Sequence, residues 1–134
     1  MRNLTTTTDL AVTLSKDRPG ELAKAVKAIA NAGVNIEGYS EADGIFHCVT
    51  NDPSKARQAL EKAGHAVRET QVAAFEAEDR PGFLAEVLGQ AADQDINLTV
   101  TYTLTKTRIC IGAEQFDKLQ ETLRKTAPVA AGRS

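Results

Sequence analysis

The sequence predicts an α+β fold made of two βαββαβ units, each an antiparallel sheet with helices on one face. Three observations support this fold class. The tetrapeptide Asp-Arg-Pro-Gly occupies residues 17–20 and recurs at residues 79–82, which is 62 residues later. Alternating apolar and polar stretches predict strands, and stretches with helical periodicity lie between them in the same order in both halves. We therefore expect one domain at residues 1–70 and a second at residues 71–134.

The two halves match over most of their length. At the offset of 62 residues, Leu22 aligns with Leu84 and Cys48 aligns with Cys110. Beyond Cys110 the match continues only after a shift of one residue, which indicates a single insertion in a connecting loop. A repeat this long that occurs twice is typical of a duplicated small domain and not of a helical solenoid.

In the first half, the opening elements follow from local patterns. Apolar side chains alternate over residues 9–14, which predicts a strand. Pro19 fixes its own φ and Gly20 tolerates left-handed angles, so the tetrapeptide predicts a sharp turn. Apolar residues then recur at helical spacing, so the turn leads into an amphipathic helix over residues 20–32.

A hairpin and a second helix complete the first half. Asp43-Gly44 is a strong hairpin signal. Asp52 before Pro53 predicts an N-cap followed by proline at the first helical position. The elements predicted here are strands at residues 34–40, 45–50 and 66–69 and a helix at residues 53–63. This order is the ferredoxin-like plan.

The second half predicts the same plan with a weaker end. Its predicted elements are strands at residues 72–77, 96–104 and 108–112 and helices at residues 82–92 and 114–125. Thr70 and Gln71 leave almost no linker, so the last strand of the first unit can continue into the second unit. Residues 126–134 are rich in alanine, so we expect the fourth strand of this unit to be weak or absent and its sheet edge to be open.

Composition excludes several classes of function. A net charge of −2 supplies no basic surface for nucleic acid or an anionic membrane. The two cysteines have no CxxC spacing, so we expect no disulfide, no metal and no cofactor. No apolar run approaches the roughly 18 residues that span a bilayer. These features lead us to expect a cytoplasmic protein.

The sequence gives little support to catalysis. His47-Cys48 is the one base and nucleophile adjacent in sequence, but neighbouring side chains on a strand point to opposite faces. We therefore expect a protein that is not an enzyme.

The third strand of each unit is partly apolar on both faces. We therefore expect the other unit or a second chain to cover the second face of the sheet.

The residues that carry the repeat resemble the ACT domain family, the small-molecule regulatory modules of enzymes in amino-acid metabolism. The resemblance rests on Asp-Arg-Pro-Gly, on the Leu-Ala that follows one residue later in both copies, and on an Asn at the opening of the second strand. These motifs read Glu21-Leu22-Ala23 and Val34-Asn35-Ile36 in the first unit, and Phe83-Leu84-Ala85 and Ile96-Asn97-Leu98 in the second. The resemblance covers nearly the whole chain and implies a stand-alone tandem pair.

The resemblance also implies an effector site where the first turn of one ACT domain faces the second strand of another. Carried over, the site comprises Asp17, Arg18, Pro19, Gly20, Glu21, Leu22, Asn35, Ile36, Asp79, Arg80, Pro81, Gly82, Phe83, Leu84, Asn97 and Leu98. Free N–H groups at a helix start suit a carboxylate. We expect the N–H groups of residues 20–22 to bind the carboxylate of the ligand, and Asp17 or Asp79 to bind its ammonium group. The Asn side chains would provide a polar anchor. Glu21 opposite Phe83 predicts that the two sites differ.

Structural roles are the alternative for these residues. Asp17 and Asp79 could cap the helices, and Asn35 and Asn97 could satisfy local backbone groups. Two functions stay open. The first is a non-catalytic regulatory protein, expected as a homodimer, that binds an amino acid or similar small ligand at ACT–ACT interfaces. The second is an oligomerisation or interaction subunit that regulates a partner enzyme of metabolism without binding a ligand itself.

Overall fold

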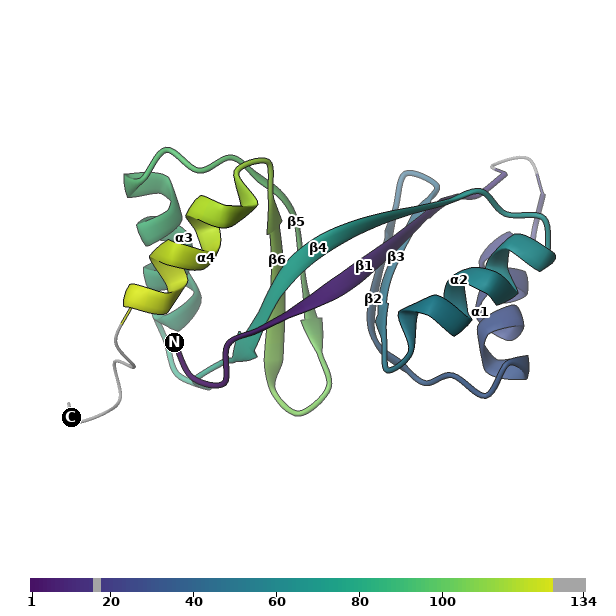
Figure 1. The fold of residues 1–134 in the computed structure, drawn as a ribbon, viewed down its shortest axis with the longest axis horizontal. Coiled ribbons are helices and arrows are strands. Elements are labelled where there is room, and N and C mark those ends of the chain that lie inside the picture. The colour runs from purple at the N-terminus through teal and green to yellow at the C-terminus, as the bar shows by residue number, and fades with distance from the viewer. Residues whose placement is uncertain (16–17, 127–134) are drawn as a thin grey trace. The chain divides into compact units, whose positions relative to one another are not determined.

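The computed structural model describes residues 1–15 and 18–126 of the 134-residue chain (Figure 1). The chain divides into two compact units. We call residues 8–70 the inserted unit, and residues 1–7 together with 71–134 the split unit. The sequence predicts a division into residues 1–70 and 71–134, and the compact units differ from it at residues 1–7.

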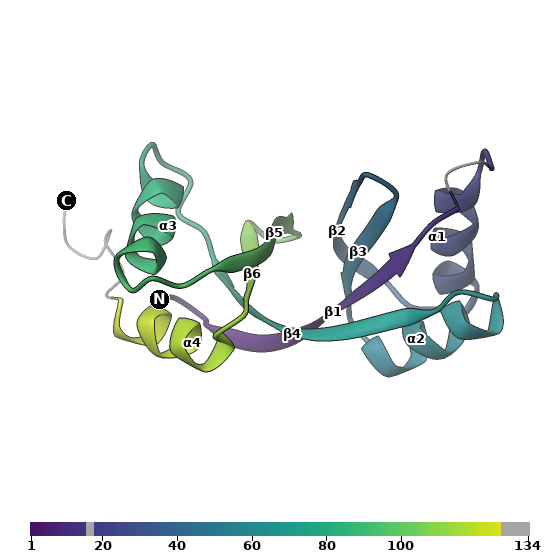
Figure 2. The same ribbon diagram turned by 90° about the horizontal axis from the view of Figure 1, so that it is seen from above.

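The inserted unit has the predicted element order. It contains most of β1 (Thr5–Thr13), then α1 (Glu21–Asn31), β2 (Ile36–Ala42), β3 (Ile45–Thr50), α2 (Pro53–Lys62) and the first part of β4 (Val67–Glu76). Its strands follow the order β2-β3-β1-β4, and β3 is antiparallel to both β1 and β2. Figure 2 shows both helices on the same side of the hairpin formed by β2 and β3.

Local chemistry explains where the elements of the inserted unit begin and turn. Gly20, the N-cap of α1, has φ of 86°, which lies in the left-handed region that glycine tolerates. Asp52 caps α2 through its side chain, which accepts a hydrogen bond from Lys55 N at 3.1 Å. Asp43 and Gly44 both have positive φ, as a two-residue hairpin turn requires.

The split unit repeats this plan. It contains the second part of β4, then α3 (Phe83–Asp93), β5 (Leu98–Leu104), β6 (Arg108–Ala113) and α4 (Phe116–Lys125). Its strands follow the order β1-β4-β6-β5, and β6 is antiparallel to both β4 and β5. Among the described residues, the ten elements confirm the predicted fold class of two ferredoxin-like units with helices on one face.

The amino-terminal segment supplies the fourth strand of the split unit. Glu76 N donates to Arg2 O at 3.0 Å, and Thr5 Oγ1 donates to Ala74 O at 3.5 Å. Met1 and Leu4 pack against the core of this unit. The prediction of an open edge is therefore wrong, because the strand comes from the start of the chain and not from the residues after the last helix. Residues 127–134, on which that prediction rested, lie outside the described residues.

The register of the strands corrects the alignment of the two cysteines. Cys48 pairs with Leu10 and Tyr39, and the residue at the corresponding place in the split unit is Ile111, not Cys110. The cause is the hairpin loop, which has two residues in the inserted unit and three, residues 105–107, in the split unit. The one-residue insertion thus precedes the third strand. Both cysteines are buried, and neither forms a disulfide within the described residues.

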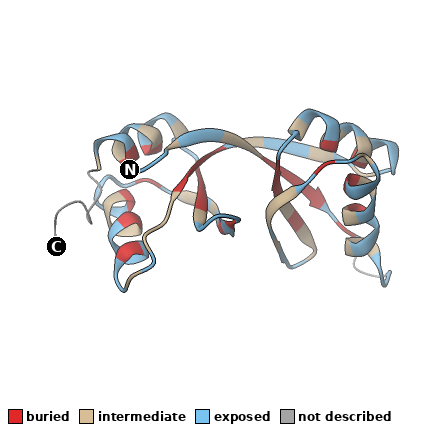
Figure 3. Cartoon of the chain, turned by 90° about the horizontal axis from the view of Figure 1, so that it is seen from below, coloured by how far each residue is buried: buried red, intermediate tan, exposed pale blue. Residues whose placement is uncertain are grey.

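Each unit has its own core between the sheet and its two helices. In the inserted unit the fully buried members include Leu10, Ile29, Phe46 and Leu60. In the split unit they include Phe75, Ile111 and Leu119. Figure 3 shows that buried residues concentrate on the strands and on one side of each helix.

The sheet faces opposite the helices also carry buried residues. Ala11 and Val49 in the inserted unit, and Val72 and Ala74 in the split unit, are at most 6% exposed and alternate with residues of the helix-facing cores. This agrees with the apolar second face seen in the sequence. Coverage by the other unit or by a second chain stays a prediction.

Candidate functional site

The turn before α1 borders a hollow of about 280 Å³ in the inserted unit. Its lining residues are Leu14, Ser15, Arg18, Gly20, Glu21, Leu22, Glu41 and Gly44. Four of them, at positions 18 and 20–22, are predicted site residues. The hollow therefore joins the start of the helix to the tip of the β2–β3 hairpin.

The hairpin residues of this hollow are not found from the sequence. Leu14 N donates to Gly44 O at 2.7 Å, and Gly44 N donates to Glu41 Oε2 at 3.1 Å. These bonds bring the hairpin tip to the end of β1. The signal that could have found them is strand pairing, because Thr13 at the end of β1 pairs with Ile45 at the start of β3.

The start of α1 offers hydrogen-bond donors to this hollow. The first helical bond runs from Lys24 N to Gly20 O at 2.9 Å. Among the described residues, the N–H groups of Glu21, Leu22 and Ala23 have no acceptor. Lys24 Nζ lies 3.8 Å from Glu21 Oε2. The partial positive charge of the helix start and the free donors make this turn suited to a carboxylate.

The corresponding turn of the split unit is held by its own side chains. Arg80 Nε donates to Glu78 Oε1 at 2.7 Å, and Arg80 Nη2 donates to Glu86 Oε1 at 2.9 Å. The Arg80 guanidinium also lies over the ring of Phe83, 5.7 Å from its centre. Hydrogen bonds to Glu86 and then to Glu78 raise the pKa of the Arg80 guanidinium above its usual value. The charge at this turn is therefore neutralised within the protein.

Two further predicted residues of the split unit have contrasting positions. Phe83 is 5% exposed and belongs to the core, so it contributes to folding. Leu84 is 48% exposed. Pro19 and Pro81 are exposed at the two turns. The Phe83 side chain is thus a core residue, and its predicted part in ligand binding stays a prediction.

In the split unit, the tetrapeptide carboxylate, Asp79, does not cap the following helix α3. The N-cap of α3 is Gly82, without a side-chain capping bond, and Asp79 is exposed. Within residues 1–15 and 18–126, Asp79 has no hydrogen-bonding or ionic partner. Asp17, its counterpart in the inserted unit, lies outside the described residues.

Asn35 and Asn97 lie at the opposite end of their helices. Asn35 N donates to Asn51 Oδ1 at 3.0 Å, and Asn51 N donates to Asn35 O at 3.1 Å. Asn97 N similarly donates to Gln115 Oε1 at 3.3 Å. In the part of the chain that the structure describes, both Asn side chains are exposed and have no hydrogen-bond partner.

Inside one unit, the turn and the Asn do not form one site. The 11 residues of α1 rise about 16 Å at 1.5 Å per residue, and this length separates Gly20 from Asn35. Ile36 and Leu98, which follow the two Asn residues, pack against the cores of their own units. A site that uses both a turn and an Asn therefore needs a second domain.

His47 and Cys48 are not arranged for nucleophilic catalysis. His47 Nδ1 lies 2.8 Å from Asp9 Oδ2, whereas Cys48 belongs to the core on the helix side. Burial, and then the charge of Asp9, raises the pKa of the Cys48 thiol to about 12. The thiol is therefore protonated at neutral pH. Within the described residues, no group of three His, Cys, Asp or Glu side chains could hold a metal ion.

Comparison with known proteins decides the family. A family model described as an ACT domain pair matches residues 5–122. The chain belongs to this ACT domain family. The inserted and split units are its two ACT domains, and we call them the inserted and split ACT domains below. A search of curated proteins finds no match.

Solved structures share the fold of this ACT domain pair. A protein from Bacteroides thetaiotaomicron is 25% identical with a TM-score of 0.78, covering 92% of this chain and 90% of that one. The ligand-free regulatory subunit of aspartate kinase from Thermus thermophilus is 16% identical with a TM-score of 0.65, covering 93% and 97%. Aspartokinase III from E. coli, in complex with lysine and aspartate, is 13% identical with a TM-score of 0.59, covering 91% and 31%.

The helices of the ACT domain pair are short. Each of the four described helices has 10 or 11 residues. In the described part of the chain, no helix has the length and apolar character to cross a membrane.

Proposed function

We propose that this ACT domain pair is a non-catalytic regulatory protein that binds an amino acid, or a similar small carboxylate, at the turn before α1. The observation that carries the proposal is the hollow lined by Glu21, Leu22 and Glu41, in which the backbone N–H groups of Glu21 and Leu22 have no acceptor among the described residues. An α-amino acid has one carboxylate for the N–H groups and one ammonium for a carboxylate. Both kinds of partner line this hollow.

Charge supports the inserted ACT domain as the primary site. Arg18 lines the hollow, and no salt bridge or hydrogen bond engages it within the described residues. Arg80, its counterpart, is engaged by Glu78 and Glu86. A ligand carboxylate gains a cationic partner at the first turn, but at the second turn it must compete with two protein carboxylates.

The exposed Asn side chains are the part of the proposed site that a second ACT domain would contribute. The amide of Asn35 or Asn97 would anchor the ligand from another ACT domain, in a homodimer or within one chain. A ligand that contacts two domains favours the arrangement in which both halves of the site meet. Binding would thereby shift self-association or the affinity for a partner enzyme.

A thermal-shift screen against the twenty amino acids tests this function. A ligand that binds only the native state raises the melting temperature by mass action. Lysine and aspartate come first, because the E. coli aspartokinase III structure was determined with both. We expect one or two amino acids to raise the melting temperature, and Glu41→Gln to weaken binding at least fivefold because it removes the carboxylate for the ligand ammonium.

Asp79→Asn is the matched control, because it changes an exposed carboxylate at the other turn. It should leave the shift unchanged. If all twenty amino acids at 10 mM leave the melting temperature unchanged, the amino-acid-binding function is wrong. The interaction subunit would then be favoured, and exposed Tyr39 and Leu84 would be the first contact residues to replace in a search for a partner enzyme.

A further inference from the structure

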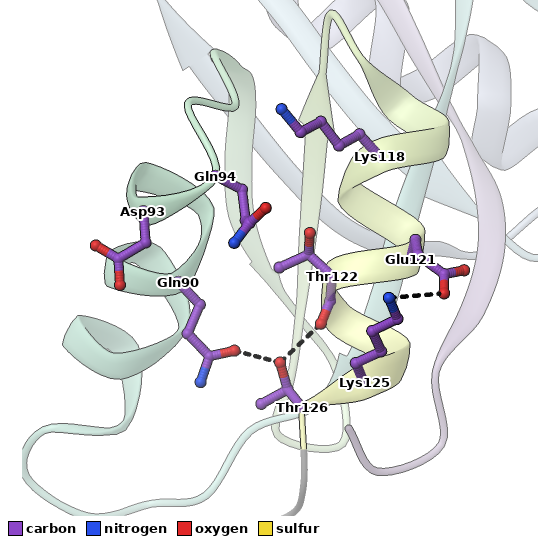
Figure 4. A pocket seen from close by; sticks show the side chains of 8 residues that line it. All are labelled: Gln90, Asp93, Gln94, Lys118, Glu121, Thr122, Lys125 and Thr126. Atoms are coloured by element: carbon purple, nitrogen blue, oxygen red, sulfur yellow. Dashed lines mark hydrogen bonds and ion pairs between the residues drawn. The ribbon is translucent and has the colours of Figure 1, made fainter.

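A polar groove lies between α3 and α4 of the split ACT domain, on the side of the sheet that the helices cover. It has a volume of about 450 Å³. Two stripes of side chains face each other across it: Gln90 on α3 with Gln94, the C-cap of α3, and Lys118 with Thr122 on α4 (Figure 4). Members of each stripe are four residues apart, so they lie on one side of their helix.

The polar side chains are not needed to pack the two helices. The inserted ACT domain has the same helix pair, and its residues align at an offset of 62 for α3 and 63 for α4. Alanine occupies four of these aligned positions in the inserted domain. Ala28, Ala32, Ala59 and Ala63 stand where the split domain has Gln90, Gln94, Thr122 and Thr126. Four alanines are therefore sufficient for this fold, and the polar set belongs to one domain alone.

The groove presents mainly hydrogen-bond donors. The Thr126 hydroxyl is bonded to Gln90 Oε1 and lies 2.8 Å from Thr122 O, so the Gln90 amide keeps its NH₂ group free. Among the described residues, the Gln94 amide and the Lys118 ammonium have no partner. Lys118 alone can donate three hydrogen bonds.

The acidic residues at the rim do not cancel these donors. Glu121 Oε2 lies 3.5 Å from Lys125 Nζ, and Glu121 also pairs with Arg124, so its charge is compensated locally. Figure 4 shows the Asp93 carboxylate directed away from α4, whereas the Gln94 amide is directed into the space between the helices. The space is therefore rich in donors and carries the charge of Lys118.

We propose that this groove binds the oxyanion of a small hydroxylated molecule, with Lys118 and the Gln94 amide on the anionic group. The volume exceeds what a bare phosphate or carboxylate fills and lies in the usual range for small-molecule pockets, roughly 300–1,000 Å³. The Gln90 amide and the Thr122 hydroxyl are then available to the hydroxyl groups of the ligand. This site is separate from the amino-acid turn before α1 and does not depend on it.

Amide chemical-shift titrations of the full chain test the site with four probes. These are glucose 6-phosphate, gluconate, inorganic phosphate and uncharged glucose. We expect one of the two charged sugars to shift amides of residues 90–94 and 118–122 with millimolar affinity, and glucose to bind at least tenfold more weakly. The stronger of the two identifies the oxyanion as phosphate or carboxylate, and weaker binding of inorganic phosphate shows that the hydroxylated body contributes.

Two variants and one control separate the site from general surface charge. Lys118→Met removes the ammonium, and the double variant Gln94→Ala, Thr122→Ala recreates the alanines of the inserted domain. Each should weaken binding at least tenfold without changing the melting temperature by more than about 2 °C, because these positions are not in the core. Lys55→Met, at the position that aligns with Lys118, should have no effect. Absence of binding by every probe, or equal losses in the Lys118 and Lys55 variants, would overturn the proposal.

Discussion

The two ACT domains have the same turn backbone and opposite surroundings. Gly20 has φ of 86° and ψ of 3°, and Gly82 has φ of 91° and ψ of −15°. The residue after the glycine is Glu21 in one domain and the buried Phe83 in the other. One helical turn further on, the inserted domain has Lys24 where the split domain has Glu86.

This difference separates what the tetrapeptide does from what its neighbours do. The Pro-Gly turn sets the backbone for entry into the helix in both domains. The charge that a ligand meets depends on the residues around the tetrapeptide: Lys24 lies near the turn in the inserted domain, whereas Glu78 and Glu86 engage Arg80 in the split domain. A duplicated motif therefore predicts two similar turns but not two equivalent binding sites.

The expected difference between the domains that affects the most residues concerns the amino-terminal strand. Deletion of residues 1–7 should destabilise the split domain by on the order of 3 kcal/mol, because Leu4 and Met1 leave its core and β4 loses a neighbour. Hydrogen exchange resolved by residue should show faster exchange in β6 than in β3. Arg2→Ala is the control, since only its backbone carbonyl takes part, and it should change neither strand. Equal acceleration in β3 and β6 would contradict this role.

The next prediction compares how much the residues that follow the two glycines, Phe83 and Glu21, contribute to stability. Phe83→Ala should lower the free energy of unfolding by about 3–5 kcal/mol, because it leaves a cavity in a packed core. Glu21→Ala should lower it by about 1 kcal/mol or less, since within the described residues the Glu21 side chain forms one ion pair, a 3.8 Å contact with Lys24. Urea denaturation measures both. A loss of similar size in the two variants would mean that the turns are packed alike.

A smaller and equal effect is expected at the glycines themselves. Gly20→Ala and Gly82→Ala should each cost about 1–2 kcal/mol, because both positions have left-handed φ. Space is not the cause: among the described residues, nothing lies within 4 Å of a Cβ at Gly20, and the ends of two flexible side chains lie 3.8–3.9 Å from one at Gly82. Asn at either position should cost less than Ala, because Asn enters this region more readily. Unequal costs would show that the two backbones are not equivalent.

Much of the fold follows from the sequence because its signals are local. The hydrophobic period, Asp52-Pro53 and Asp43-Gly44 are contained within single elements, and the observed helices begin and end within two residues of the predicted ones. The place of the amino-terminal strand does not follow, because Arg2 meets Glu76, which is more than seventy residues away. The cysteine alignment fails for a related reason, since one extra loop residue changes the face on which every later side chain of the strand lies.

The candidate site is only partly accessible from the sequence. The turn at residues 18–22 comes directly from the repeat, but Glu41 joins it through the pairing of β3 with β1 and β2. The Arg80 ion pairs were not expected, although Glu86 six residues later lies within reach of the guanidinium. A role for Asn35 and Asn97 in the same site stays a prediction.

Exchanging the charges one helical turn after the glycines tests the comparison most finely. Lys24→Glu should weaken amino-acid binding at the inserted domain, because it places a carboxylate near the helix start that holds the ligand carboxylate. Glu86→Lys should do the reverse in the split domain, since it releases the two Nη atoms of Arg80 from their bidentate partner, while Glu78 keeps its bond to Nε. We expect the stoichiometry measured by isothermal titration to rise from one toward two ligands per chain in Glu86→Lys. The melting temperatures of both variants should change by only a few degrees, because the side chains of Lys24 and Glu86 are exposed. If both variants bind amino acids as the unaltered protein does, the charges around the turns do not select the binding site. The difference in binding between the two domains must then arise from Glu41 and the hairpin, and Glu41→Gln tests this directly.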